Sequence, residues 1–205
     1  MIIKLILKEE KVVNIGIDID DTLTDIRDKL RESALEYAKK LGKSINLEYI
    51  EDKNNGNVYQ QKYGFTYEEL KYFLKNIQEE ITKEAKPRKY VVEIIKKLRT
   101  EGHKIYIITA RDDEFHDDPY LLSKNWLDKN NIEYDKLIVN AREKAKICMQ
   151  ENIDLFIDDQ LANCMKISNE NINVIRITNY KEKHGNIVNK TNWKEIYKYI
   201  KELEY

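Results

Sequence analysis

Three carboxylates and a hydroxyl at the end of one apolar run are the residues best placed to do chemistry in this chain. They are Asp18, Asp20, Asp21 and Thr22, and they end the β-prone stretch that begins at Ile15. Side chains alternate along a strand, so Asp18 and Asp20 point to the same side and can converge on one ion or one phosphorus atom. Carboxylates this close repel one another, and Mg²⁺, a hard cation that prefers oxygen ligands, would relieve that repulsion.

A simpler interpretation of the same run needs no chemistry. Asp and Thr are common where a strand turns into a helix, because their side chains accept hydrogen bonds from free backbone N–H groups. The run alone fits both interpretations, and the residues further along the chain decide between them.

From residue 87 onward, strand-like and helix-like segments alternate. Pro87 is expected to begin a helix that Gly102 ends. The strands expected after it are 104–108, 136–139, 153–157 and 174–178, with helices between them and a last helix from Trp193. Such alternation implies right-handed crossovers and an α/β fold, with a parallel sheet covered by helices on both faces.

The stretch after the first strand contains helices but no good strand. Helix periodicity covers 25–41, and a capping box at 66–69 opens a helix that reaches about residue 84. The polar stretch 42–64 between them, marked by Asn and Gly, is expected to be a loop. We therefore predict two units: a core of residues 1–24 and 87–205, and a small helical cap of residues 25–86 inserted after the first strand.

Polar residues end three of the expected strands. They are Asp18, Asp20 and Thr22, then Thr109 and Arg111, and then Asp158 and Asp159. Ligands bind at the carboxyl ends of the strands in an open parallel sheet, so these residues are expected to meet at one edge. Lys144 and Lys146 precede the third of these strands, near the start of their helix. The ordered set is far more specific than any one member, which favours a chemical role.

In this order and spacing, the motifs resemble those of the haloacid dehalogenase-like (HAD) superfamily of phosphotransferases. The positions that match its four motifs are Asp18, Asp20 and Thr22, then Thr109, then Lys144 or Lys146, and then Asp158 and Asp159. The resemblance spans the chain apart from the cap. It implies a three-layer, Rossmann-like parallel sheet and a Mg²⁺-dependent phosphomonoester hydrolase.

A closer resemblance is to the bacterial branch of the 5′(3′)-deoxyribonucleotidase family. It rests on Thr109-Ala-Arg111, Trp126-Leu127, Arg142-Glu-Lys144 and Ile157-Asp158-Asp159. A helical cap between the first two motifs is also similar to that family. This resemblance implies that the substrates are nucleoside monophosphates, although substrate choice in these folds is made by the cap.

The resemblance also implies a role for each acid. Asp18 would attack phosphorus and form an aspartyl-phosphate. Asp20 would protonate the leaving alcohol and then deprotonate the water that cleaves this intermediate. Mg²⁺ would be held by the carboxylates of Asp18 and Asp158 and by the backbone carbonyl of Asp20. Asp159 would either hydrogen-bond to the direct ligands or bind the ion through a water molecule.

The phosphoryl oxygens would be held by Thr109, by the site lysine and by backbone N–H groups around Thr22. Arg111 is expected either to reach the phosphate or to form a salt bridge that holds its loop. The choice between Lys144 and Lys146 as the phosphate lysine stays open, because the two lie within one helical turn.

Aromatic residues of the cap are candidates for substrate recognition. Tyr63, Phe65 and Tyr67 lie where a cap could offer a platform for a base. The alternative is that they fill the small core that a 60-residue cap needs. His116 and the two acids after it are expected to form a solvated loop, because a second set of metal ligands is missing.

Composition limits the remaining function classes. Lys and Arg number 36 against 37 Asp and Glu, so a basic surface for a nucleic-acid polymer is not expected. Cys148 and Cys164 lack metal-ligand spacing and are expected to be reduced core residues of a cytoplasmic protein.

The N-terminal apolar stretch is too short and too charged for a membrane span. The role of residues 1–10 and the oligomeric state, including a homodimer, stay open.

Two other functions compete with a nucleotidase. One is a phosphatase of another small phosphomonoester, such as a sugar phosphate. The other is a phosphorelay receiver, an interaction protein that also joins acids, a Thr and a Lys on a doubly wound sheet. The receiver is disfavoured because Asp18 lies on the first strand and the lysine precedes the acidic pair. A silent binding protein is disfavoured because every expected chemical position is filled.

Overall fold

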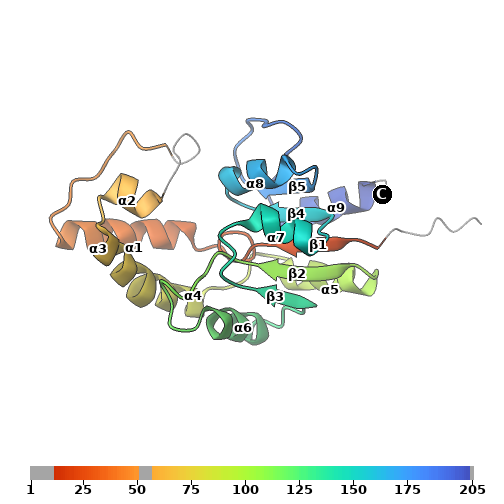
Figure 1. Ribbon diagram of the computed structural model, residues 1–205, viewed down its shortest axis with the longest axis horizontal. Helices are drawn as coiled ribbons and strands as arrows, with labels where there is room; N and C mark the ends of the chain where they lie inside the picture. Colours follow the sequence, from red (N-terminus) through yellow and green to blue (C-terminus); the bar gives the residue numbers. More distant parts are fainter. Residues whose placement is uncertain (1–11, 51–56, 204–205) are drawn as a thin grey trace, which may run out of the picture.

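A parallel sheet in the order β3-β2-β1-β4-β5-β6 forms the centre of the molecule (Figure 1). The computed structural model describes residues 12–50 and 57–203. Within that part the strands are β1 (Asn14–Ile17), β2 (Lys104–Ile108), β3 (Lys136–Ile138), β4 (Leu155–Asp158), β5 (Asn173–Ile177) and β6 (Val188–Lys190). The strand order changes direction between β1 and β4, which is the position where open sheets of this kind bind ligands.

β1 lies in the middle of the sheet and is covered on both faces. Ile15 and Ile17 pack in one apolar cluster, and Phe156 of the neighbouring β4 packs in another. A Cβ atom on Gly16 would lie 2.5 Å from Cδ2 of Phe156, so the absent side chain leaves room for that ring. Burial on both faces explains the continuous apolar run that precedes Asp18.

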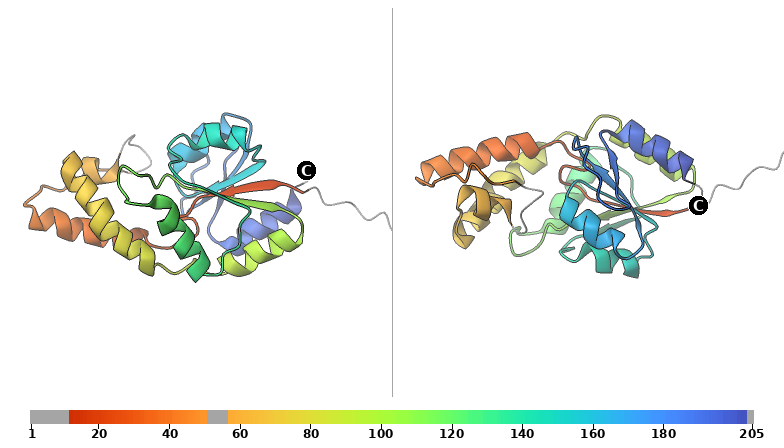
Figure 2. Two further views of the ribbon diagram at one scale, coloured as in Figure 1. Left: turned by 60° about the horizontal axis from the view of Figure 1, so that its bottom comes forward. Right: turned by 90° about the horizontal axis from the view of Figure 1, so that it is seen from above.

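Helices cover both faces of the sheet, which confirms the predicted three-layer α/β fold. The first apolar cluster holds side chains of α5 (Val91–Thr100), α6 (Pro119–Lys129) and α9 (Trp193–Glu202). The second holds side chains of α7 (Lys144–Gln150) and α8 (Leu161–Ser168). In the right-hand view of Figure 2, α9 lies on one side of the sheet and α7 and α8 on the other. Cys148 and Cys164 are buried in the second cluster, as expected of core residues.

Between β1 and β2 the chain leaves the sheet and forms helices beyond the carboxyl ends of the strands, at the left of Figure 1. These are α1 (Arg27–Lys40), α2 (Val58–Tyr63), α3 (Tyr67–Tyr72), the π-helical segment η2 (Phe73–Gln78) and α4 (Glu79–Glu84). α1, α2, α3 and η2 share an apolar cluster of their own, which includes Tyr63, Phe65 and Phe73, whereas Ile81 of α4 packs against the first cluster of the core. The boundaries of a cap at residues 25–86 remain a proposal, which this separate cluster supports.

The two connections between the sheet and these helices pair with each other. Thr24 and Pro87 form an antiparallel bridge, and the N–H of Arg88 donates to the carbonyl of Leu23 at 2.7 Å. The prediction that Pro87 begins a helix is therefore wrong, because α5 begins at Val91. Proline fits such an isolated bridge because it has no N–H that would need a partner.

Two further elements differ from the expectation. The stretch 42–64 contains α2, whose start is capped by Asn57 and whose end is formed by Gly64 with a φ of 69°. β6 was not expected, since it has only three residues, two of them polar, and lies at the edge of the sheet. The open question about residues 1–10 lies outside the described residues.

Candidate active site

Three neighbouring strands deliver polar residues to the same edge of the sheet. Ile17 of β1 pairs with Ile107 of β2 and with Ile157 of β4. Asp18 and Asp158 therefore lie side by side one residue further on, where the N–H of Asp18 donates to the carbonyl of Ile157 at 3.0 Å. The sheet register thus gathers at one point the carboxylates predicted from separate motifs.

Lys144 lies between the first two of these acids. Its Nζ is 2.6 Å from Oδ1 of Asp18 and 2.7 Å from Oδ2 of Asp158, and all three side chains are buried. Lys146, one half-turn further along α7, is exposed. Burial alone would lower the pKa of the Lys144 ammonium, but Asp158 and Asp18 raise it above its ordinary value. The structure therefore brings Lys144, and not Lys146, to this edge.

The acids hold more negative charge than Lys144 can neutralise. The pKa of Asp18 is raised from 3.8 to about 7, chiefly by burial and also by Asp158 and Asp20, while Lys144 opposes the rise. Burial and the neighbouring Asp158 also hold the pKa of Asp159 well above its usual range. A group of this kind gains free energy from an added cation, because the cation stabilises the ionised carboxylates.

Asp18, Asp158 and Asp159 form a donor set that fits a divalent cation. Each offers a carboxylate oxygen, and these oxygens lie within 4.8 Å of one another. The Asp158 carboxylate is oriented by the N–H of Gln160 at 2.8 Å and by the amide of Asn163 at 3.1 Å. Oxygen ligands on a rigid buried edge match the preference of hard cations.

Asp20 is bound by a fork of two hydrogen bonds. Nε and Nη2 of Arg111 lie 2.9 and 2.7 Å from its two carboxylate oxygens, and Nη1 of Arg111 donates to Ser123 at 3.3 Å. Burial would raise the pKa of Asp20, but the adjacent guanidinium lowers it below its ordinary value. Of the two expectations for Arg111, the structure shows a salt bridge, and its partner is the expected acid–base residue.

The two predicted threonines are buried beside these acids. Thr22 donates from Oγ1 to Oδ1 of Asp159 at 3.4 Å. Thr109, directly after β2, accepts the N–H of Arg111 on Oγ1 at 3.3 Å. Both hydroxyls thus border the carboxylate edge, and their contact with phosphate stays a prediction.

The three cap aromatics have different surroundings. Tyr63 and Phe65 are each only 3% exposed, inside the apolar cluster of the helical segment. Tyr67 is 45% exposed, and its hydroxyl donates to Glu114 at 2.6 Å. Its ring lies 6.2 Å from that of Phe115. The packing of Tyr63 and Phe65 is that of core residues, so Tyr67 alone is left facing the loop that follows Arg111.

That loop contains residues that sequence analysis did not assign to the site. Phe115 packs against the apolar cluster of the helical segment, and Arg142 binds both Asp112 and Glu114. The expectation of a solvated loop is wrong for His116, which is buried with Nδ1 3.2 Å from Glu79 of α4. Phe115 is an apolar residue in an acidic stretch, and it was the one feature of the sequence that indicated packing of this loop against another part of the protein.

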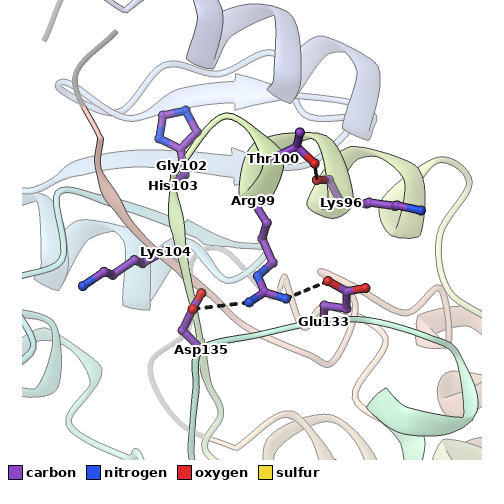
Figure 3. Close-up of a pocket in the computed structure, with 8 residues that line it drawn as sticks. All are labelled: Lys96, Arg99, Thr100, Gly102, His103, Lys104, Glu133 and Asp135. Atoms are coloured by element: carbon purple, nitrogen blue, oxygen red, sulfur yellow. Dashed lines mark hydrogen bonds and ion pairs between the residues drawn. The ribbon is translucent and has the colours of Figure 1, made fainter. Parts of the chain in front are cut away.

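A surface cavity of about 440 Å³ lies at the other end of the sheet (Figure 3). Lys104 begins β2 and Asp135 immediately precedes β3, so this cavity borders the amino ends of the strands. Arg99 points across it and binds Glu133 and Asp135 at 2.7 and 3.4 Å. The cavity is therefore separate from the acid edge.

Comparison of the sequence with protein families gives one match that spans the chain. The family of 5′ nucleotidase, deoxy (pyrimidine), cytosolic type C proteins matches residues 11–203. A nucleotidase of Clostridium acetobutylicum is 31% identical over 195 residues, which cover 93% of this chain and 95% of that one. A protein of Bacillus cereus is 32% identical over 192 residues, which cover 91% and 97%.

Solved structures share the fold at low sequence identity. A haloacid dehalogenase-like family hydrolase of Streptococcus pneumoniae superposes with a TM-score of 0.62, at 14% identity, over 92% of this chain and 98% of that one. A predicted phosphatase of Clostridium acetobutylicum gives 0.64 at 18% identity, over 94% of this chain and all of that one. In the described ranges, none of the helices has the length and apolar character needed to cross a membrane.

Proposed function

This chain belongs to the family of cytosolic type C 5′ nucleotidases, and on that premise we propose that it hydrolyses nucleoside monophosphates with Mg²⁺ through an aspartyl-phosphate on Asp18. Family membership establishes the coarser statement, that the chain is a phosphomonoester hydrolase with a HAD-like fold. The observation that carries the proposal is the buried meeting of Asp18, Lys144 and Asp158 at the carboxyl edge of the sheet.

The proposed reaction has two steps at phosphorus. Oδ of Asp18 forms a bond to phosphorus while the bond to the leaving alcohol breaks, and Asp20 gives that alcohol a proton. Asp20 then takes a proton from a water molecule, whose oxygen attacks phosphorus and releases Asp18 and inorganic phosphate. Asp20 thus enters and leaves the cycle protonated and is ionised only between the two steps.

The salt bridge with Arg111 favours the ionised, proton-accepting form of Asp20 in the free protein. Donation in the first step needs a higher pKa, and the negative charge of a bound phosphate beside Asp20 would raise it. Arg111 would at the same time keep the carboxylate oriented toward the leaving group. A direct contact between Arg111 and the phosphate remains part of the proposal.

Mg²⁺ would be held by carboxylate oxygens of Asp18 and Asp158, with the backbone carbonyl of Asp20 and the carboxylate of Asp159 completing the set. When bound, it would neutralise charge on the phosphoryl oxygens and on the acids. Lys144, Thr109 and backbone N–H groups around Thr22 would hold the remaining oxygens, since preformed donors stabilise the charge that develops during transfer.

The nucleoside is proposed to lie between the helical segment and the loop after Arg111. Tyr67 is the exposed aromatic residue there, and Phe115 and Arg142 flank it. An aromatic ring beside a guanidinium suits a flat, polar base better than a sugar, which favours nucleotides over sugar phosphates. A cytoplasmic location is expected with such substrates.

A phosphate-release screen tests this proposal. Deoxynucleoside monophosphates, ribonucleotides and sugar phosphates are offered with Mg²⁺ or with a chelator, to the wild type and to Asp18→Asn. We expect release from nucleotides that needs Mg²⁺ and disappears in the variant. Release from sugar phosphates alone would overturn the substrate class, and turnover by Asp18→Asn would overturn the nucleophile.

A further inference from the structure

Arg27, the first residue of α1, reaches from the inserted helices back into the acid edge. Its Nη2 contacts Oδ2 of Asp159, and its Nε lies 3.1 Å from Oδ2 of Asp21. The other oxygen of Asp159 accepts from Oγ1 of Thr22 at 3.4 Å. One oxygen of this buried carboxylate is therefore held by the core and the other by the first helix of the inserted segment.

The backbone at the start of α1 is tied to the same place. Oδ1 of Asp21 accepts the N–H groups of Ile26 and Arg27 at 3.1 and 2.7 Å. The carbonyl of Asp21 accepts from Nε of Arg88, on the returning connection, at 3.0 Å. Asp21 thus anchors both the guanidinium of Arg27 and the first turn of its helix. The guanidinium cannot move far without disturbing that turn.

Asp159 is also one of the three carboxylates that can hold a cation. A divalent cation and a guanidinium that share one carboxylate repel each other, strongly so in a buried site of low dielectric constant. We propose that Arg27 is a positioning residue that couples cation binding at Asp18, Asp158 and Asp159 to the start of α1. This inference rests on the cation site of the proposed function.

The coupling has two consequences that must match. If the cation weakens the contact between Arg27 and Asp159, then Arg27 must weaken cation binding by the same free energy, because linkage is reciprocal. A cation would also loosen the first turn of α1, and hence the point where the helical segment leaves the sheet. Removing the guanidinium should abolish both effects together.

Calorimetric titration with Mg²⁺ alone, without substrate, tests the first consequence. We expect Arg27→Met to bind Mg²⁺ at least about fivefold more tightly than the wild type, which is the lower end of ordinary coupling. Arg27→Lys should fall between them, because an ammonium keeps the charge but lacks the planar fork with which a guanidinium binds two carboxylates through different nitrogens. Arg31→Met is the matched control, since Arg31 lies one turn along α1 and pairs with Asp28 at 3.9 Å.

Hydrogen exchange of the wild type tests the second consequence without any variant. Mg²⁺ should speed exchange of the amides of Ile26 and Arg27, and it should leave those of α9 unchanged. Equal Mg²⁺ affinity in Arg27→Met and Arg31→Met, or unchanged exchange at the start of α1, would overturn the coupling while the cation site stands. Wild-type protein that binds no Mg²⁺ would overturn the coupling and the metal part of the proposed function together.

Discussion

At the scale of single residues, the site is a set of carboxylates whose negative charge is only partly neutralised by nearby cations. Lys144 pairs with Asp18 and Asp158, Arg111 pairs with Asp20, and Arg27 pairs with Asp159. The acids could be predicted from the sequence because each lies at or just beyond the end of a strand. Their cationic partners were harder to predict, since pairing depends on side-chain direction in the folded chain. Arg27 in particular looks like an ordinary basic residue of a helix, and nothing in the sequence indicates that it reaches the site.

The two lysines of α7 offer a matched pair of variants. Lys144→Met should lower kcat/KM by about 100-fold or more, the usual effect of removing one preorganised donor from a site of developing charge. Lys146→Met should stay within about twofold of the wild type, because its side chain is exposed. Steady-state phosphate release measures both. Equal losses in the two variants would show that Lys144 has no special role.

The salt bridge of Asp20 predicts a pH-dependent stability. Arg111 holds the pKa of Asp20 below its ordinary value of 3.8, so the stabilisation is fully present above that value and is lost as pH falls through the lower, folded-state pKa. Arg111→Met should therefore lower the free energy of unfolding by roughly 2 kcal/mol near pH 7. The difference from the wild type should shrink below about pH 4.

Urea unfolding at several pH values measures this difference. Arg99→Met is the control, because its ion pairs with Glu133 and Asp135 lie at the surface and such pairs contribute little. A difference for Arg111→Met that stays constant down to pH 3 would mean that the charge of Asp20 is not what Arg111 stabilises.

At the scale of elements, the strand–helix alternation was enough to predict the parallel sheet and its reactive edge. It failed at Pro87, where the two connections pair with each other and no helix begins. It also missed α2, although Asn57 and Gly64 are ordinary helix-ending signals, because a polar six-residue helix has little periodicity. Short elements whose partners are distant in sequence leave little local signal.

Gly16 tests how closely β1 and β4 pack. Gly16→Ala should lower the free energy of unfolding by about 1–3 kcal/mol, because its Cβ would lie 2.5 Å from a ring atom of Phe156. Adding Phe156→Leu should restore part of that loss by removing the ring. Chemical denaturation of both variants gives the comparison. A fully stable Gly16→Ala would contradict the close packing of these strands.

At the scale of the whole molecule, the helical segment meets the core through the loop that follows β2. Tyr67 binds Glu114, Glu79 binds His116, and Phe115 packs among the helices. The sequence predicted an insertion but not this contact, since its residues come from segments 40 or so positions apart. The loop begins directly after Arg111, so it links the acid edge to the surface proposed to receive the nucleoside.

Tyr67 tests that surface. Tyr67→Ala should raise KM for a nucleoside monophosphate by about two- to tenfold, since one lost aromatic contact is worth roughly 0.5–1.5 kcal/mol. It should leave hydrolysis of p-nitrophenyl phosphate nearly unchanged. Tyr72→Ala is the control, because this tyrosine is similarly exposed on α3 but stacks on Tyr37. Equal effects of the two variants on both substrates would place the nucleoside elsewhere.

The most direct measurement is a search for the phosphoryl group on Asp18. Asp20→Asn can neither protonate a leaving alcohol nor activate water, so it is mixed with Mg²⁺ and p-nitrophenyl phosphate, whose leaving group departs without a proton. The reaction is quenched in acid and the protein is mapped by mass spectrometry. We predict a phosphoryl group on the peptide that contains Asp18, and none when Asp18→Asn is added. A phosphoryl group on another residue would contradict the mechanism. So would turnover by the wild type in which water attacks the substrate directly and no residue is labelled.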